Sequence, residues 1–177
     1  MLISVHIPKT AGTTFGALLS RRYGPGLLKD YDDRPLSHSG PVRLVRALAG
    51  IPRATRRLRG YEAVHGHFLP LKYLAARGDV VVWLRDPVQR MVSRYEHYLR
   101  DVEARRPLQA IRGLRPGLDL ATFIEIPRFH DTYAKYLRGF PRERVACFGF
   151  SEDMAEGLAR MQRRLGLDLA PAGQENV

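Results

Sequence analysis

Residues 2–15, LISVHIPKTAGTTF, are the stretch that decides the fold. Leu2–Ile7 is a short run of apolar and β-branched residues, which predicts a buried strand. Pro8 cannot donate a hydrogen bond to a sheet ladder, so it ends that strand. A second apolar pattern, at helical spacing, begins at Phe15 and predicts a helix that ends near residues 23–26. The stretch therefore predicts a strand, a tight loop and a helix in immediate succession.

The loop, residues 8–14, has the composition of an anion-binding loop, with one lysine, one glycine and three threonines. Such a loop directs backbone N–H groups at one point, where the helix N-terminus adds partial positive charge. It is not a Walker A sequence, because Lys9 comes first and no glycine precedes it. The simpler alternative is an ordinary helix start, in which Thr13 or Thr14 is only the N-cap.

Composition bounds the class of protein. A chain of 177 residues with 45% apolar residues is expected to form one domain, residues 1–177, around a real core. There is no run long enough for a membrane span and no secretory pattern, and the single cysteine, Cys147, cannot form an intrachain disulfide. The expectation is a cytoplasmic protein without stable membrane insertion.

The formal charge of +11 indicates an anionic ligand or partner. The sequence lacks the alternation of basic and aromatic residues that stacks single-stranded bases, and the arginines of residues 53–59 are better explained as a solvated helix face. We therefore do not expect nucleic acid as the partner.

Strands and helices alternate along the chain, which predicts an α/β three-layer, P-loop-like domain with a mainly parallel central sheet flanked by helices. Further strands are expected at 61–64, 80–84 and 144–148, helices at 42–49, 52–58, 71–76, 88–105, 118–126, 130–137 and 151–165, and a loop at 24–40. Ligands of such sheets bind at the carboxyl ends of the strands. Lys9, His67 and Arg85 each follow a predicted strand, so we expect them on one rim.

A second informative stretch is RDPVQRMVSRY, residues 85–95. Arg85 leaves a predicted strand, and Ser93 lies about two turns into the following helix. A strand-end guanidinium and a helix hydroxyl can converge on one phosphate. The alternative is that Arg85 pairs with Asp86 or with a helix end and that Ser93 lies on the surface.

Together, PKTAGTTF and RDPxxRxxSxY resemble the sulfotransferases that use 3′-phosphoadenosine 5′-phosphosulfate (PAPS). The closest resemblance is to the carbohydrate sulfotransferases related to the heparan and uronyl 2-O-sulfotransferases. It implies that the first loop holds the 5′-phosphosulfate, that Arg85 and Ser93 hold the 3′-phosphate, and that 3′,5′-ADP is the product. The implied cofactor-binding residues are Lys9, Thr10, Ala11, Gly12, Thr13, Thr14, Arg85 and Ser93.

The resemblance also implies that the second histidine of the HGH segment, His67, is the catalytic base, with His65 as a helper. The chemistry fits, because a histidine of near-neutral pKa can take the acceptor proton and Lys9 can neutralise the charge of the leaving phosphate. Gly66 between them is expected to let the backbone approach a ligand closely.

No metal is expected to be required, because no carboxylate pair marks a metal site. A zinc site at His65 and His67 would need at least a third ligand, and the other histidines and Cys147 lie in separate predicted elements.

Two other functions remain open. One is a P-loop-type kinase or nucleotide hydrolase, for which Asp86 is the only candidate magnesium ligand at a strand end. The other is a basic domain that binds an anionic polymer without catalysis. For the sulfotransferase, a sugar hydroxyl is the favoured acceptor, with a small molecule, a lipid headgroup or a peptide tyrosine as alternatives.

Overall fold

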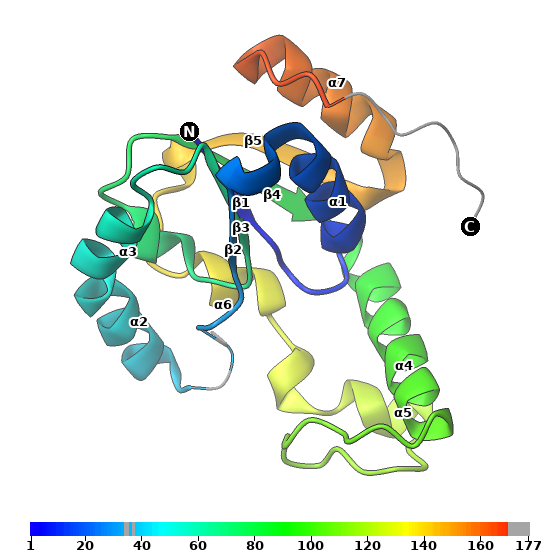
Figure 1. Ribbon diagram of the computed structural model, residues 1–177. Coiled ribbons are helices and arrows are strands. Elements are labelled where there is room, and N and C mark those ends of the chain that lie inside the picture. The colour runs from blue at the N-terminus through cyan, green and yellow to red at the C-terminus, as the bar shows by residue number, and fades with distance from the viewer. Residues whose placement is uncertain (34–35, 37, 170–177) are drawn as a thin grey trace.

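Five parallel strands form a single sheet in the computed structural model of the chain, which describes residues 1–33, 36 and 38–169 (Figure 1). The strands are β1 (Leu2–Val5), β2 (Leu27–Asp30), β3 (Ala63–Gly66), β4 (Asp79–Leu84) and β5 (Val145–Phe150). The helices are α1 (Gly12–Tyr23), α2 (Gly40–Ala49), α3 (Ile51–Arg57), α4 (Pro87–Glu103), α5 (Leu120–Ile124), α6 (Thr132–Leu137) and α7 (Met154–Leu165). Short 3₁₀ helices are η1 (Gly24–Gly26), η3 (Pro70–Tyr73), η4 (Pro127–Phe129), η5 (Arg142–Arg144) and η6 (Ser151–Asp153).

The strand order is β2-β3-β1-β4-β5, which places β1 in the centre. Leu2 of β1 is in register with Ala63 of β3 on one side and with Asp79 of β4 on the other. The chain leaves β1 toward β2 at one edge, and it leaves β4 toward β5 at the opposite edge. A crevice forms outside the carboxyl ends of two adjacent strands where the connections diverge in this way, and here these strands are β1 and β4.

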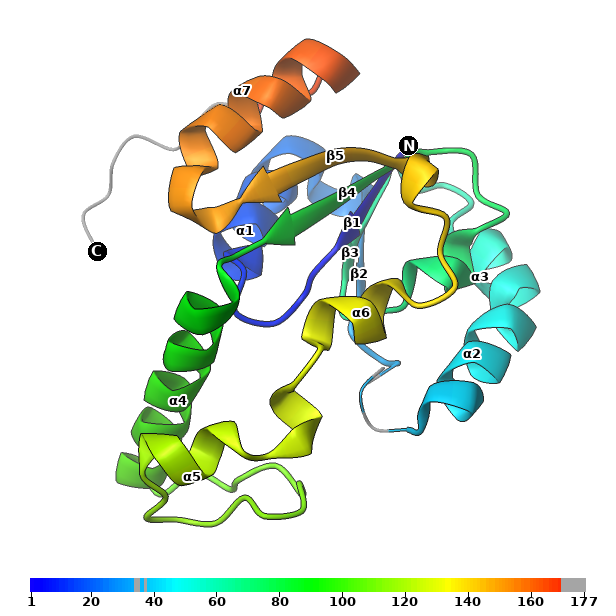
Figure 2. The same ribbon diagram turned by 180° about the vertical axis from the view of Figure 1, so that it is seen from behind.

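Helices cover both faces of the sheet (Figures 1 and 2). Alternate residues of a strand point to opposite faces, so Val80 and Val82 join the core beneath α3, η3 and α6, while Val81 and Trp83 join the core beneath α1 and α7. Because both faces are buried, β4 is a nearly continuous apolar run. This is the three-layer α/β architecture with a parallel sheet that the sequence predicts.

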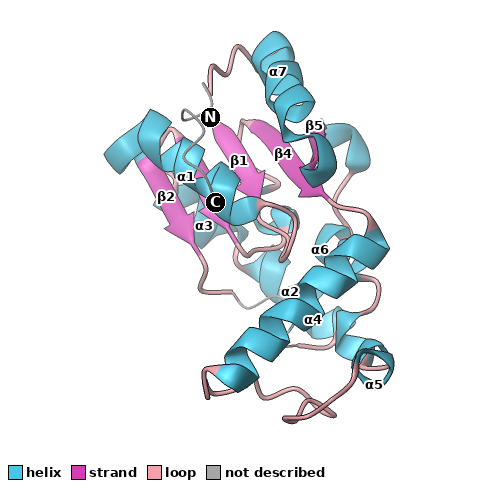
Figure 3. Cartoon of the chain, turned by 90° about the vertical axis from the view of Figure 1, so that its right-hand side faces the viewer, coloured by secondary structure: helices cyan, strands magenta, loops and turns pink. Residues whose placement is uncertain are grey.

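Helix α4 extends away from the carboxyl end of the sheet, with α5 alongside it (Figures 1, 2 and 3). It carries its own small core, in which Tyr98 packs against Phe123, Phe129 and their neighbours from residues 111–126. The phenol of Tyr98 also fixes the adjoining loop, since it donates to the Arg115 carbonyl at 2.9 Å and accepts from the Leu118 N–H at 2.7 Å. The long helix is therefore buttressed as one wall beside the strand ends.

The prediction of a continuous loop over residues 24–40 is wrong at Leu27–Asp30, which is strand β2. The backbone of these residues pairs with β3, from Leu27 opposite Ala63 to Asp30 opposite Gly66. The predicted helix over 118–126 is also too long, since α5 covers only Leu120–Ile124. In place of the helix predicted over 71–76, the chain forms only the 3₁₀ helix η3. The remaining predicted elements are present with shifted ends, and the tail after residue 169 lies outside the described residues.

No helix within residues 1–33 and 38–169 is long and apolar enough to cross a bilayer.

Candidate functional site

The loop between β1 and α1 is held in a conformation that exposes backbone donors. Lys9 and Ala11 have left-handed backbones, with φ of 69° and 60°. Ala11 accepts the first helical hydrogen bond, from the Phe15 N–H at 3.0 Å. The N–H groups of the first three residues of α1 therefore have no acceptor within the helix. No described side chain caps them. Left-handed non-glycine residues are costly and gather at functional sites, and here they leave a helix start whose free N–H groups could bind an anion.

This loop opens into a cleft of about 850 Å³ at the carboxyl ends of β1 and β4. The cleft brings together most of the predicted site. Of the predicted residues, Lys9, Ala11, Gly12, Thr13, His67, Arg85 and Ser93 line it. The two motifs, some seventy residues apart in sequence, therefore meet in one place.

Three predicted residues do not line the cleft: Thr10, Thr14 and His65. Thr10 is fully buried, and its hydroxyl donates to the Ile7 carbonyl at 2.8 Å, which fixes the turn of the loop from within. Thr14 is exposed on α1. Thr10 and Thr14 therefore contribute their backbones, but not their side chains, to the predicted anion-binding loop.

Helix α4 supplies a stripe of polar residues that sequence reasoning identified only at Ser93. Arg90, Ser93, Arg94 and His97 all line the cleft, and their spacing of three, four and seven residues places them on one helix face. Arg90 donates to the Phe129 carbonyl at 3.0 Å, and the Arg94 guanidinium lies 4.3 Å from the Phe129 ring centroid. The same spacing in the sequence was the signal that could have revealed them.

The charge of the cleft is one-sided. Among the described residues, its lining includes five lysines and arginines (Lys9, Arg85, Arg90, Arg94 and Arg128) and no aspartate or glutamate. Burial, then repulsion from Arg100, Arg94 and Arg85, lowers the pKa of Lys9. Burial, then Arg90, lowers the pKa of Arg94 to about 10. Cations held this close without carboxylates among the lining residues favour a ligand with several negative charges.

The rings of His6, His67 and Tyr31 form another wall of the cleft. The ring centroids of His6 and His67 are 4.2 Å apart, and the Tyr31 ring stands edge-on to His67 at 4.9 Å. His67 Nδ1 is 2.5 Å from the His6 carbonyl oxygen, which can only accept, so this nitrogen carries the proton. In neutral His67 the proton-accepting nitrogen is therefore Nε2. Sequence reasoning missed His6 and Tyr31.

His65 lies behind the loop rather than in the cleft. It is buried, with Nδ1 2.8 Å from the Ser4 hydroxyl and Nε2 3.1 Å from the Gly12 carbonyl, so both ring nitrogens are engaged within the protein. Its position supports a role in holding the start of α1. Gly66 does not serve a ligand as expected: a Cβ there would lie 1.7 Å from the Asp30 carbonyl oxygen, so glycine permits the close pairing of β2 and β3.

Acid is expected to destabilise the fold through these rings. Burial lowers the pKa of His6 to about 3 and of His65 to about 4, against 6.5 in the unfolded chain. Below pH 6.5 the unfolded chain therefore binds protons that the folded chain excludes, and the free energy of unfolding falls until those lower pKa values are passed. Urea denaturation from about pH 7 to about pH 4.5 measures the decline. His65→Gln should make it shallower, and exposed His130→Gln should not; equal slopes would contradict this account.

Asp86, the candidate magnesium ligand of the kinase alternative, serves as a helix cap. Its carboxylate accepts from the N–H groups of Val88 at 3.0 Å and Gln89 at 2.9 Å at the start of α4. It does not line the cleft. In the part of the chain that the structure describes, no group of three or more His, Cys, Asp or Glu side chains is arranged to hold a metal ion.

The chain is therefore an α/β domain with a parallel sheet. Its cleft is lined by cationic side chains, has a volume of about 850 Å³, and lies outside β1 and β4, where the strand connections diverge. No family model matches the chain, and no curated protein matches it significantly.

Proposed function

We propose that the chain is a PAPS-dependent sulfotransferase that transfers a sulfuryl group to a hydroxyl, with a carbohydrate as the favoured acceptor. One observation carries the proposal: residues of the PKTAGTTF loop and of the RDPxxRxxSxY motif line one cleft, whose described lining holds five basic residues and no carboxylate. PAPS carries negative charge at both its 5′ and 3′ positions, so two cationic motifs at one site match its two ends.

In this proposal the loop binds the 5′ end of the donor. The N–H groups of Gly12, Thr13 and Thr14 and the ammonium of Lys9 contact the 5′-phosphosulfate, while Arg85 and Ser93 contact the 3′-phosphate. Tyr133 supports this arrangement, because its hydroxyl donates to the Arg85 carbonyl at 2.5 Å and accepts from the Arg85 N–H at 3.1 Å. The backbone at the exit of β4 is thereby fixed.

His67 acts as the base. Its Nε2 takes the proton of the acceptor hydroxyl as that oxygen forms a bond to sulfur, and the bond from sulfur to the 5′-phosphate oxygen breaks. Lys9 and the α1 N-terminus neutralise the charge that develops on the departing phosphate. The product complex then contains 3′,5′-ADP, the sulfated acceptor and one proton on His67.

The activity is tested with an acceptor screen. Incubating the protein with PAPS and pools of saccharides, phenols and lipids should yield products heavier by one sulfuryl group in mass spectra, with 3′,5′-ADP formed in equal amount. Protein carrying Lys9→Ala is the control for contaminating enzymes. An absence of sulfated product across all pools would contradict the proposal.

Transfer is expected to survive chelation. The transferring group carries fewer negative oxygens than a γ-phosphate, and Lys9 with the helix N-terminus can neutralise the leaving group without a metal. We expect the rate of product formation to change less than about twofold when EDTA is added. Complete loss, restored by one divalent ion, would favour the kinase-like alternative instead.

A further inference from the structure

The outward face of helix α2 is apolar although it faces solvent. Pro41, Val42, Val45, Leu48 and Ala49 are all exposed, and Val42, Val45 and Leu48 have exposed fractions of 46%, 65% and 45%. The opposite face of α2 is the packed one, where Leu44 and Ala47 contact Leu69 and Leu71. In Figures 1 and 2, α2 and α3 lie at the outer edge of the molecule, and no described element covers them.

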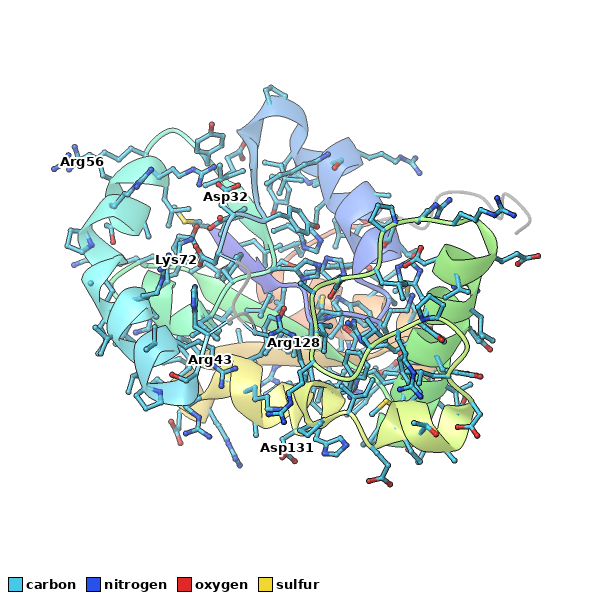
Figure 4. The ribbon with its side chains drawn as sticks, turned by 90° about the horizontal axis from the view of Figure 1, so that it is seen from below. Asp32, Arg43, Arg56, Lys72, Arg128 and Asp131 are labelled. Carbon is cyan, nitrogen blue, oxygen red and sulfur yellow. The ribbon has the colours of Figure 1, made fainter. Side chains whose placement is uncertain are left out.

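The same segment is strongly basic. Residues 40–59 contain six arginines and no aspartate or glutamate. Two of the six differ from the others. Arg57 donates to Asp32 at 3.1 Å. Arg43 is only half-buried on the side of the molecule that carries Arg128 (Figure 4), and burial, then repulsion from Arg138 and Arg128, lowers its pKa.

The other four arginines, at positions 46, 53, 56 and 59, are exposed and form no ion pair with a described residue. Figure 4 shows Arg56 directed away from the body of the protein. An exposed apolar stripe in a segment that also carries exposed arginines without ion pairs to described residues is the pattern of a segment that lies in the headgroup region of a bilayer.

We propose that the α2–α3 surface, defined by Val42, Val45, Leu48, Arg46, Arg53, Arg56 and Arg59, docks on an anionic membrane. The valines and the leucine enter the boundary between headgroups and acyl chains, and the arginines contact lipid phosphates. Nucleic acid would match the arginines but would leave the apolar stripe uncovered. A second copy of the chain in a two-fold contact would bring the same arginines against each other. Charge and apolar exposure together therefore favour the lipid surface.

The test is cosedimentation of the full chain with vesicles, and its outcome does not depend on the proposed sulfotransferase activity. We expect binding to phosphatidylcholine vesicles containing about 30% phosphatidylglycerol, little binding to pure phosphatidylcholine, and weakening at high salt. Each basic residue near an anionic surface contributes about fivefold in partitioning, so Arg53, Arg56 and Arg59 changed to Gln should reduce binding about a hundredfold. Changing Val42, Val45 and Leu48 to Ser should reduce it at least about tenfold.

Matched controls separate this surface from general charge and hydrophobicity. Arg21, Arg77 and Arg142 changed to Gln remove the same charge from exposed positions elsewhere, and these variants should bind as the wild type does. The apolar control changes three exposed apolar residues elsewhere to Ser, and it should also bind as the wild type does. These residues are Val88, Leu99 and Phe150, with exposed fractions of 67%, 44% and 47%.

Three results would overturn the proposal. The first is that the wild type does not bind vesicles, and the second is that the control variants lose as much vesicle binding as the α2–α3 variants. The third is that the wild type is a dimer that does not bind vesicles and that the Ser variant is a monomer. Should the Ser variant fold poorly by circular dichroism, the arginine variants and the salt dependence decide alone.

Discussion

Replacing His67 with alanine is expected to lower turnover by about 10²- to 10⁴-fold, the usual contribution of a positioned general base. The structure supplies the geometry for this role, since His67 lines the cleft and its Nδ1 is engaged by the His6 carbonyl. Binding of 3′,5′-ADP should change little, because His67 belongs to neither motif that contacts phosphate. Turnover is measured with the acceptor that the screen identifies, and binding is measured by calorimetry.

The pH dependence gives a second readout of the same variant. A base must be neutral to act, and burial lowers the pKa of His67 below 6.5. The acidic limb of the rate profile should therefore lie below pH 6.5 in the wild type and vanish in His67→Ala. Exposed His130→Ala is the matched control and should keep both rate and limb. If His67→Ala kept normal turnover while His65→Ala or His6→Ala lost it, the base would be the histidine whose replacement abolishes turnover.

The second large effect concerns the two ends of the donor. Arg85→Ala should weaken binding of 3′,5′-ADP by about 10- to 100-fold, because a charge-assisted contact contributes about 1.5–3 kcal/mol. Binding of adenosine 5′-phosphosulfate should hardly change, since it lacks the 3′-phosphate. Calorimetric titration of both ligands into wild type and variant measures the difference.

Lys9→Ala is the comparison variant for this experiment, because Lys9 is assigned to the 5′ end of the donor. It removes a cation from the 5′ end, so both ligands should lose affinity by similar factors. The pair of variants thus separates the two subsites without any assay of turnover. Equal losses for both ligands in Arg85→Ala would refute the assignment of Arg85 to the 3′-phosphate.

Much of the fold could be predicted from the sequence because the most informative strands are continuous apolar runs. The run through Val80–Leu84 is buried on both faces, and a pattern of that kind depends little on the rest of the chain. Strand β2 was not readable for the opposite reason. It lies in a segment that Pro25, Asp32, Asp33, Pro35 and Gly40 mark as a loop, and only tertiary contacts make Asp30 a buried residue. Its carboxylate accepts from Tyr73 at 2.5 Å and pairs with Lys72 at 2.7 Å.

Part of the candidate site could be predicted because some of its residues belong to local sequence motifs. Lys9, Arg85 and Ser93 belong to local motifs, and their convergence follows from strand ends sharing one rim. His6 and Tyr31 belong to no motif. They reach the site because the residues after β1, β2 and β3 meet there, with Tyr31 3.1 Å from His6 Nδ1. The separation of His65 from His67 also needed the structure, because residues two apart in a strand share a face but the second lies beyond the strand end.

Calorimetric titration of the wild-type chain with 3′,5′-ADP, in parallel with 5′-AMP and with ATP plus Mg²⁺, tests the central claim most directly. The account predicts that 3′,5′-ADP binds at least about tenfold more tightly than 5′-AMP, through contacts of its 3′-phosphate with Arg85 and Ser93. It also predicts that 3′,5′-ADP binds more tightly than ATP plus Mg²⁺, because the cleft lining within the described part of the chain contains no carboxylate to hold the cation. Equal binding of 3′,5′-ADP and 5′-AMP, or a preference for ATP plus Mg²⁺, would contradict it.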